Sequence, residues 1–485
     1  MNERLVVVAL VGRVVVLFSL LMCVPLGFAV WHEDPAQIAF VQSIAFSVAL
    51  GLAMTLPMRR HRRELQLRDG FILVVLTWVV LPAIGSLPLW LAIEGLSFTD
   101  AYFEAMSGFT TTGATVLVRL DALPVSINVW RCFMSFIGGL GIVVLAVAIL
   151  PLLGVGGTQM FKAESAGPMK DTKLTPRIAE TARGLWGVYF GAALMCVLVF
   201  RMAGMSWDDA FMHMCTTVSA GGFSPYDASF AHWNSPLIEA AAIVFMLAAG
   251  VSWALYFVAL RQRSLNALWS SIELRAYLLV VLATVVVVTI YLDVNEVYPD
   301  LVTSLRQAAF HVVSIATTTG FANTDYGQWP AFVPWLMLLV GCFATCAGST
   351  GGGVKMVRML LLLKQSRREL VRIAHPNVVN PVVLAGALVP PRVMQSVIAF
   401  MMMYGATLVS LTMLLLFSGL DVVTAFTALV ACLNNIGPGL GTVGPAGNFQ
   451  ALSDFQTWVC TAAMLLGRLE LLSVLVLFTP QFWRR

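Results

Sequence analysis

Charged residues are scarce in this chain. Of its 485 residues only 11% are Asp, Glu, Lys or Arg, whereas 59% are hydrophobic, and the mean hydropathy is +0.86. A soluble domain carries about 25% charged residues, so this composition indicates a protein that lies in a membrane. The longest polar stretches, around residues 158–183 and 364–392, are too short to bury a core of their own. We therefore expect no separate soluble domain.

The chain also lacks the sequence patterns of catalysis. It contains no nucleotide-binding fingerprint, no catalytic triad motif and no cysteines at metal-ligand spacing. The closest pair of its eight cysteines, Cys342 and Cys346, is more typical of small packing residues than of a site. We therefore expect no enzyme activity, no organic cofactor and no nucleic-acid partner.

Ten long apolar runs fill most of the chain, and each approaches or exceeds the ~20 residues that cross a bilayer. They cover residues 5–30, 36–57, 70–94, 128–154, 183–205, 236–260, 273–293, 333–363, 393–418 and 457–478. The first run follows Arg4 as a signal peptide would. It continues to Val30 without the usual small-residue cleavage site, so we expect it to remain as a span. Ten spans place both termini on the same side of the membrane.

Basic residues follow alternate spans. Of the 29 Lys and Arg residues, 24 fall on the side of the termini: Arg4, Arg13 and the clusters within residues 59–68, 162–183, 261–275, 355–392 and 484–485. The positive-inside rule then predicts that both termini are cytoplasmic. Sixteen of the 25 acidic residues fall on the opposite, outer side. They are either solvated loop ends or a negative vestibule that concentrates cations.

One pattern occurs four times along the chain. An alanine is followed twelve residues later by a glycine in the pairs Ala101 and Gly113, Ala210 and Gly222, Ala308 and Gly320, and Ala425 and Gly437. Each copy opens with an apolar run that carries a phenylalanine and ends in small or polar residues. We call the last four residues of each copy its closing: 110–113, 219–222, 317–320 and 434–437. Long apolar segments flank every copy. Such a fourfold unit of helix, short re-entrant helix, extended strand and helix is typical of a cation pore.

We therefore predict an all-α polytopic membrane protein with four pseudo-fourfold helix–pore-loop–helix repeats around one central pore. Ten transmembrane helices and four re-entrant pore helices make up this fold. The predicted divisions are an N-terminal transmembrane hairpin at 1–69, and pore repeats at 70–157, 158–262, 263–364 and 365–485, the third of which contains an intramembrane loop.

The closing residues of the four copies offer oxygen atoms without a formal charge. The predicted filter consists of Thr111, Thr112, Gly113, Ala220, Gly221, Gly222, Thr318, Thr319, Gly320, Asn435, Ile436 and Gly437. Irregular backbone survives at membrane depth only where it lines protein or water, and its carbonyl groups can then replace the hydration shell of an ion. Glycine allows the turn that this requires. A ring of carboxylates would hold divalent ions, and none of the four closings contains one.

These residues resemble the Trk/Ktr/HKT family of potassium transporters. The likeness is carried by Thr-Thr-Thr-Gly in the first and third copies and by Asn-Asn-Ile-Gly-Pro-Gly-Leu-Gly in the fourth, and it covers essentially the whole chain. Two extra N-terminal spans resemble the TrkH branch more than the shorter KtrB proteins. The resemblance implies potassium uptake across the bacterial inner membrane, a homodimer with one pore per subunit, and a cytosolic TrkA-like ring that binds nucleotides.

A glycine-rich break interrupts the predicted span 333–363. It runs from Ala347 to Gly353, and each glycine costs about 1 kcal/mol relative to alanine inside a helix. A packing kink would explain the break. We favour, as the resemblance implies, a flexible loop that crosses the ion path and gates it. The predicted gate residues are Gly348, Ser349, Thr350, Gly351, Gly352, Gly353 and Arg468.

Arg468 lies inside the last predicted span, where a charge costs at least ~2.5–3.5 kcal/mol. We interpret it either as an electrostatic brake on cations or as a structural tether to carbonyl groups of the loop. Glu470 is two positions further on and is therefore a poor partner within the same helical turn. Lys355 is either a similar brake or a lysine whose amine extends to the cytoplasmic surface.

Four residues occupy matched positions, three after each starting alanine: Glu104, His213, His311 and Ala428. Metal binding is one interpretation of the two histidines and the glutamate. Because pore helices radiate away from the pore axis, we favour hydrogen bonds that support the filter from behind.

The alternative function is secondary active cation transport, with K⁺ coupled to H⁺ or Na⁺. Such transporters also contain glycine-broken helices at the bilayer midplane. They would predict two inverted halves, whereas the four copies here share one orientation. With a single glycine per repeat, we expect a short filter that favours K⁺ and Rb⁺ but rejects Na⁺ less completely.

Overall fold

The computed structural model describes residues 5–56, 66–148 and 178–484. Helices dominate this part of the chain, and its one pair of strands, β1 (Val383–Leu384) and β2 (Ala387–Leu388), forms a short antiparallel hairpin. The described residues contain six helices long and apolar enough to cross a membrane, or up to eight if each sharply bent pair is one span. The predicted all-α polytopic fold is confirmed. Two basic clusters, at 59–63 and 162–177, lie outside the described residues.

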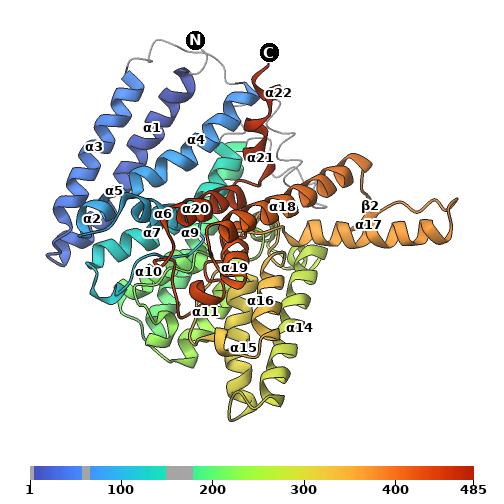
Figure 1. Ribbon diagram of the computed structural model, residues 1–485. Coiled ribbons are helices and arrows are strands. Elements are labelled where there is room, and N and C mark those ends of the chain that lie inside the picture. Colours follow the sequence, from blue (N-terminus) through green and yellow to red (C-terminus); the bar gives the residue numbers. More distant parts are fainter. Residues whose placement is uncertain (1–4, 57–65, 149–177, 485) are drawn as a thin grey trace.

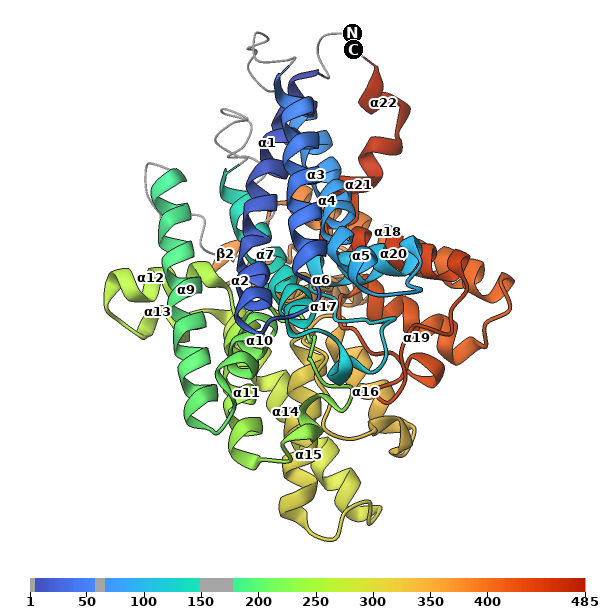
Figure 2. The same ribbon diagram turned by 90° about the vertical axis from the view of Figure 1, so that its left-hand side faces the viewer.

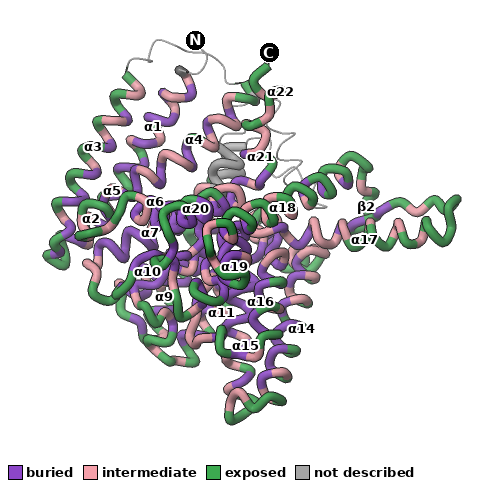
Figure 3. The backbone as a smooth tube through the Cα atoms, viewed as in Figure 1, coloured by how far each residue is buried: buried purple, intermediate pink, exposed green. Residues whose placement is uncertain are grey.

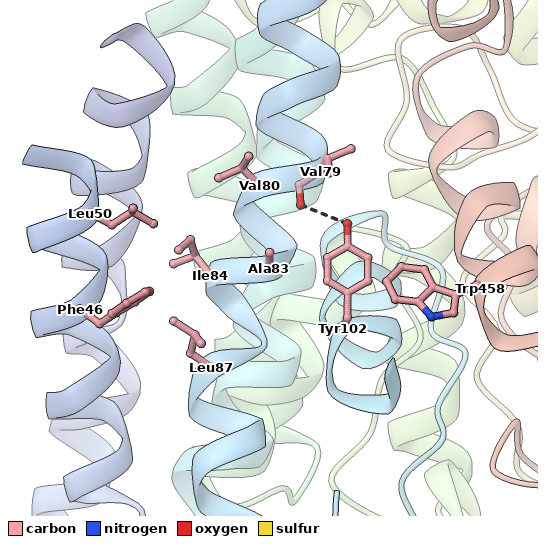
Figure 4. Close-up of a pocket in the computed structure, with 9 residues that line it drawn as sticks. All are labelled: Phe46, Leu50, Val79, Val80, Ala83, Ile84, Leu87, Tyr102 and Trp458. Atoms are coloured by element: carbon pink, nitrogen blue, oxygen red, sulfur yellow. Dashed lines mark hydrogen bonds between the residues drawn. The ribbon is translucent and has the colours of Figure 1, made fainter. Parts of the chain in front are cut away.

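The N-terminal hairpin consists of α1 (Leu5–Leu21), α2 (Cys23–Trp31) and α3 (Gln37–Thr55). Glycines let α1 and α3 approach closely, since a Cβ on Gly12 would lie 2.7 Å from the Cβ of Met54. Figure 2 shows this hairpin packed beside α4 (Leu67–Gly85). A cavity of about 460 Å³, lined almost entirely by apolar side chains, separates α3 from α4 and α5 (Leu87–Ala92) and reaches Tyr102 and Trp458 (Figure 4).

Four consecutive repeats follow, each with an outer helix, a short pore helix and a second long element. The first contains α4, α5, α6 (Phe98–Phe109) and α7 (Val125–Ala148); the second α9 (Ile178–Met202), α10 (Trp207–Val218), α11 (Pro236–Ala249) and α12 (Trp253–Gln262). The third contains α14 (Ile272–Val294), α15 (Leu301–Ala316), α16 (Phe332–Gly341) and α17 (Met356–Ala374); the fourth α18 (Pro391–Phe417), α19 (Val422–Leu433), α20 (Asp454–Arg468) and α21 (Leu472–Leu475). Two further short helices are α13 (Asn266–Trp269) and α22 (Pro480–Trp483).

The four pore helices α6, α10, α15 and α19 start in the same way. The side chains of Ser97, Ser206, Asp300 and Asp421 each accept a hydrogen bond from the backbone N–H three residues further on, at 2.8–3.0 Å. Such N-caps satisfy a donor that the first helical turn cannot. The other ends of these helices lie in the most buried part of the molecule (Figure 3), so the local sequence positions each pore helix with its C-terminus inward.

Two predicted spans are not continuous helices. Span 236–260 bends by 89° between α11 and α12, and span 457–478 bends by 105° between α20 and α21. The first bend lets the N–H of Trp253 reach the carbonyl of Gly348, and Glu470, at the second, has a φ of +51°. The break in the third repeat is also longer than predicted, because helix is absent from 342 to 355.

The third and fourth repeats are joined by an arm that extends beyond the body of the molecule. Figure 1 shows α17 and the β hairpin on this arm, with α18 returning toward α19. The predicted division between residues 364 and 365 falls within α17. The 18-residue apolar window of α18 is only 17% buried, so this helix exposes most of its apolar surface in a single chain.

Candidate functional site

All four closings have the same backbone conformation. Thr111, Ala220, Thr318 and Asn435 have φ values of +53° to +60°, and Gly113, Gly222, Gly320 and Gly437 have values of +68° to +97°. Residues other than glycine rarely adopt this left-handed backbone conformation. Because it recurs at two matched positions in every repeat, the four closings share one local fold.

The same hydrogen bonds end each pore helix. The N–H of Thr112 donates to the carbonyl of Ser107 at 2.8 Å, and the N–H of Thr111 donates to that of Gly108 at 2.9 Å. The other three repeats show the equivalent pairs, at 2.7–3.2 Å. This is a Schellman ending, which satisfies carbonyl groups left free by the last helical turn.

The four closings meet in a ring. A Cβ added to Gly113 would lie 2.5 Å from the carbonyl oxygen of Gly221, and one added to Gly437 would lie 2.7 Å from that of Thr112. Cβ atoms on Gly222 and Gly320 would overlap the carbonyl oxygens of Thr319 and Ile436. Each closing therefore contacts the next in chain order, and the fourth contacts the first. No side chain fits at any of these glycines.

Polar side chains link the closings further. The amide of Asn435 donates to the hydroxyl of Thr112 at 2.9 Å, which joins the fourth repeat to the first. In the first and third repeats the outer two threonine hydroxyls of each Thr-Thr-Thr run bond to one another, at 2.7 and 2.8 Å. The hydroxyl of Thr111 and the side-chain oxygen of Asn435 are buried and have no hydrogen-bond partner among the described residues.

Glu104, His213 and His311, which occupy matched positions in the pore helices, contact the segment that follows the closing in their own repeat. Glu104 accepts the N–H of Val116 at 3.1 Å, and Nε2 of His213 lies 3.2 Å from the hydroxyl of Ser224. His311 accepts the N–H of Asn323 at 3.3 Å. These contacts agree with the predicted supporting role. The metal interpretation gains nothing, since the described residues contain no group of three or more His, Cys, Asp or Glu side chains placed to hold an ion.

The fourth repeat has Ala428 at this position and uses its neighbour instead. The hydroxyl of Thr427 accepts the N–H of Leu440 at 2.9 Å. In the first repeat Glu104 also forms a fully buried ion pair with Arg131, at 2.7 Å, and Arg131 donates to the carbonyl of Ser224 in the second repeat. The ion pair therefore fixes Arg131, whose hydrogen bond to Ser224 ties the first two repeats together.

Several outer acidic residues are used inside the protein. Glu239 pairs with Arg306 at 2.6 Å, and Asp34 accepts the N–H groups of Ala36 and Ser126 at 2.8 and 3.0 Å. These carboxylates are neutralised or hydrogen-bonded, so they contribute less to a negative vestibule than their position in the sequence suggested.

The glycine-rich segment contacts the ring from one side. The N–H of Gly352 donates to the hydroxyl of Thr318 at 2.9 Å, and a Cβ on Gly352 would overlap the carbonyl of Asn434. The hydroxyl of Thr350 donates to the carbonyl of Val218 at 3.1 Å. Thus the segment touches the third and fourth closings and the end of α10 just before the second.

The remaining predicted gate residues lie in the same segment. Gly348 and Gly353 have φ values of +78° and +82°, and the hydroxyl of Ser349 has no partner among the described residues. The amine of Lys355 donates to the carbonyl of Gly351. Lys355 therefore folds back onto the segment and does not extend toward the surface.

Arg468 joins the segment to the first repeat. Its guanidinium donates to the carbonyl of Thr350 at 2.7 Å and to that of Gly138 at 3.1 Å, and the side chain is 4% exposed. The structure therefore contains the tether to loop carbonyls. Glu470 is no partner of Arg468, as expected, and pairs instead with Arg358 at 2.6 Å.

Sequence reasoning missed three features of this site. The first is the pair of bends, at 250–252 and at 469–471. The second is the ion pair of Arg358 with Glu470, and the third is the contact of Arg468 with Gly138. The glycine and serine at the first bend were a usable signal. No sequence spacing relates Arg468 to Gly138, which lies in a different repeat.

Four re-entrant repeats that converge on one ring define a membrane transport protein of the pore-loop class. The chain belongs to the TrkH family, since a model of that family, described as a cation transport protein, matches residues 36–485. It is 44% identical to the Trk system potassium uptake protein TrkH of Salmonella typhimurium and to that of Escherichia coli K12, each over 98% of both chains. It is also similar to the crystal structure of the potassium transporter TrkH from Vibrio parahaemolyticus, with 40% identity, a TM-score of 0.91 and full coverage of both chains.

The buried ion pair behind the ring leads to a stability prediction. Replacement Arg131→Met leaves Glu104 buried without its partner, and we expect it to destabilise the protein by about 3–5 kcal/mol. Thermal unfolding of the purified protein in detergent measures this. The control Arg372→Met removes an exposed pair with Glu369 and should cost at most about 1 kcal/mol.

The double variant Glu104→Gln, Arg131→Met removes both charges and should recover much of the lost stability. Equal melting temperatures for Arg131→Met and Arg372→Met would show that the buried pair does not hold the first two repeats together.

Proposed function

We propose that this chain takes up potassium through a channel-like pore whose filter is the ring of four closings. The observation that carries the proposal is the closed contact of Gly113, Gly222, Gly320 and Gly437 with one another's neighbouring carbonyl groups. Four backbone segments of identical conformation then surround one axis. The relatives named as potassium uptake proteins support K⁺ as the transported ion.

The filter chemistry follows from the backbone. In each closing, a residue without a left-handed φ value lies between two residues that have one. This alternation lets successive carbonyl groups face the same side, as an ion path requires. These oxygens, with threonine hydroxyls such as that of Thr111, replace the hydration shell of a monovalent ion. The unpartnered oxygens of Thr111 and Asn435 support a polar, hydrated path. A single glycine per repeat makes the filter short, so Na⁺ is rejected incompletely.

The gate of the proposed pore is the segment 347–353 together with Arg468. The segment is hydrogen-bonded to Val218 and Thr318 and contacts Asn434, and its glycines allow it to move. Arg468 is buried, has no carboxylate partner among the described residues and binds the segment at Thr350. Its positive charge opposes cation passage while the hydrogen bond keeps the segment in place.

The proposed setting is the bacterial inner membrane. The C-terminal end of the chain lies near the start of α4, since Arg68 donates to the carbonyl of Arg484 at 2.7 Å. With the positive-inside rule, this end of the molecule and both termini face the cytoplasm. The exposed apolar surface of α18 suits a homodimer with one pore per subunit. A cytosolic TrkA-like nucleotide-binding ring is the proposed regulatory partner.

The second candidate function is secondary active transport with K⁺ coupled to H⁺ or Na⁺. The sharp bends of 89° and 105° in two spans favour it, because broken helices near the midplane occur in such transporters. The fourfold arrangement in a single orientation favours the channel-like pore.

The filter prediction concerns Gly222, which has a φ of +68° and faces the carbonyl of Thr319. An alanine there costs about 1–2 kcal/mol in backbone strain and adds a steric overlap, so we expect K⁺ uptake to fall about tenfold or more. Uptake of ⁸⁶Rb⁺ into proteoliposomes, with bi-ionic K⁺/Na⁺ reversal potentials, measures this. The control Gly191→Ala lies in α9, where an added Cβ meets nothing within 4 Å.

Unchanged uptake and selectivity in Gly222→Ala would refute the filter. So would a wild-type reversal potential that shows Na⁺ to be more permeant than K⁺.

The gate prediction is that deletion of residues 348–353 raises basal K⁺ flux, because the contacts of this segment with Val218, Thr318 and Asn434 are then lost. Arg468→Gln, which removes the charge, should raise it to a smaller extent. The control is an equally long deletion of 376–381 in the exposed arm. Flux of the first variant no greater than that of the control would contradict the gate.

A third experiment separates the two candidate functions. In sealed proteoliposomes with equal K⁺ on both sides, a channel-like pore gives no net K⁺ movement when a proton gradient or, in a second arm, a Na⁺ gradient is imposed at zero membrane potential. Coupled transport gives net uptake under the same conditions, and that result would overturn the channel-like mechanism.

A further inference from the structure

One carboxylate oxygen holds both ends of the glycine-rich segment. Glu273, in the first turn of α14, accepts the N–H of Ala347 at 2.7 Å and the N–H of Val357 at 3.2 Å, both through Oε1. Ala347 begins the segment and Val357 lies in the first turn of α17. The two ends of the loop between Ala347 and Val357 therefore lie close together, as in an Ω-loop. We call these ends, with the residues beside them, the neck of the loop.

The neck of this loop is bonded to the second repeat as well. The N–H of Cys346 donates to the carbonyl of Gly250 at 3.0 Å, and the N–H of Trp253 donates to that of Gly348 at 3.1 Å. The tip has different partners, since Thr350 and Gly352 contact Arg468 and Thr318. Most of the neck's hydrogen bonds thus differ from those of the tip, and Thr345 joins the two, since its carbonyl accepts the N–H of Met356 and its hydroxyl donates to the carbonyl of Gly352, both at 2.8 Å.

The Glu273 carboxylate depends on these backbone donors. Within the part of the chain that the structure describes, no lysine or arginine forms an ion pair with it. Each hydrogen bond from a backbone N–H to a side-chain oxygen contributes about 0.5–1.5 kcal/mol. The neck is thus held by four hydrogen bonds to Glu273 and the second repeat, and Gly348 and Gly353, with φ values of +78° and +82°, are the positions at which the tip can turn relative to it.

We propose that Glu273 is a positioning residue that clamps the neck of the loop, so that the tip moves on and off the ring while the neck stays fixed. This inference rests on the proposed gate. Because the neck stays fixed, the tip returns to the same contacts with Thr318 and Arg468 after each opening.

The test compares Glu273→Ala with Glu273→Gln in the full chain. The alanine variant loses both bonds, and we expect basal K⁺ flux about tenfold above wild type. The glutamine variant keeps an oxygen at the same place and should restore nearly wild-type flux. The control Glu369→Ala removes an exposed carboxylate of α17 and should leave flux unchanged.

A second readout does not depend on flux. Cys346 lies next to the neck and is 2% exposed, so its alkylation, followed by mass spectrometry, reports opening of the neck. Glu273→Ala should speed this alkylation and Glu273→Gln should not. If Glu273→Ala does not fold, Glu273→Asp, whose shorter side chain cannot reach both N–H groups, should show the same changes to a smaller degree.

Wild-type flux and wild-type Cys346 alkylation in a folded Glu273→Ala or Glu273→Asp variant would overturn the clamp. In a chain that lacks 348–353, Glu273→Ala should add no further flux, and an additive increase would also overturn it. If the deletion itself fails to raise flux, the proposed gate is wrong, and the alkylation of Cys346 then decides the clamp alone.

Discussion

The structure depends on one requirement: backbone donors and acceptors inside a membrane protein must find partners within the protein or a hydrated path. Four helices end in the buried centre, and each end would leave carbonyl groups free. The Schellman bonds at Thr112 and its three counterparts satisfy part of this need. The rest is met between repeats, because each closing contacts the next. The ring is therefore complete only when all four helix ends are present.

Buried positive charge is handled in two ways. Arg131, which is fully buried, and Arg306, which is partly buried, are paired with carboxylates, so their contribution is structural and nearly neutral. Arg468 is bonded only to the carbonyl oxygens of Thr350 and Gly138 within the described residues, and these oxygens carry partial charge. The positive charge of Arg468, the buried arginine among the described residues that contacts the glycine-rich loop, is therefore neutralised only in part. That arrangement fits the proposed brake better than a purely structural tether, which a neutral donor would also supply.

The sequence predicted the fold class and the recurring positions, since hydropathy and a fixed spacing are local properties of the chain. It also identified Gly113, Gly222, Gly320 and Gly437, and the structure brings these together. It did not predict the bends after α11 and α20, because Gly250 and Leu469 lie in runs whose hydropathy is that of a continuous span. Nor could it relate Arg358 to Glu470, or Glu273 to Ala347, since those pairs form through the packing of helices from different parts of the chain.

Asymmetry below the ring explains how one repeat can affect all four. Above, the closings share dihedral angles and hydrogen bonds, so the ring is close to fourfold. Below, the third repeat has a helix-free loop at 342–355 after α16, and this loop reaches Val218, Thr318 and Asn434 of three repeats. Arg468 carries the contact on to the first through Gly138. In the proposed gating, a small movement of one loop tip would therefore change contacts with every repeat, while the ring would keep its own bonds.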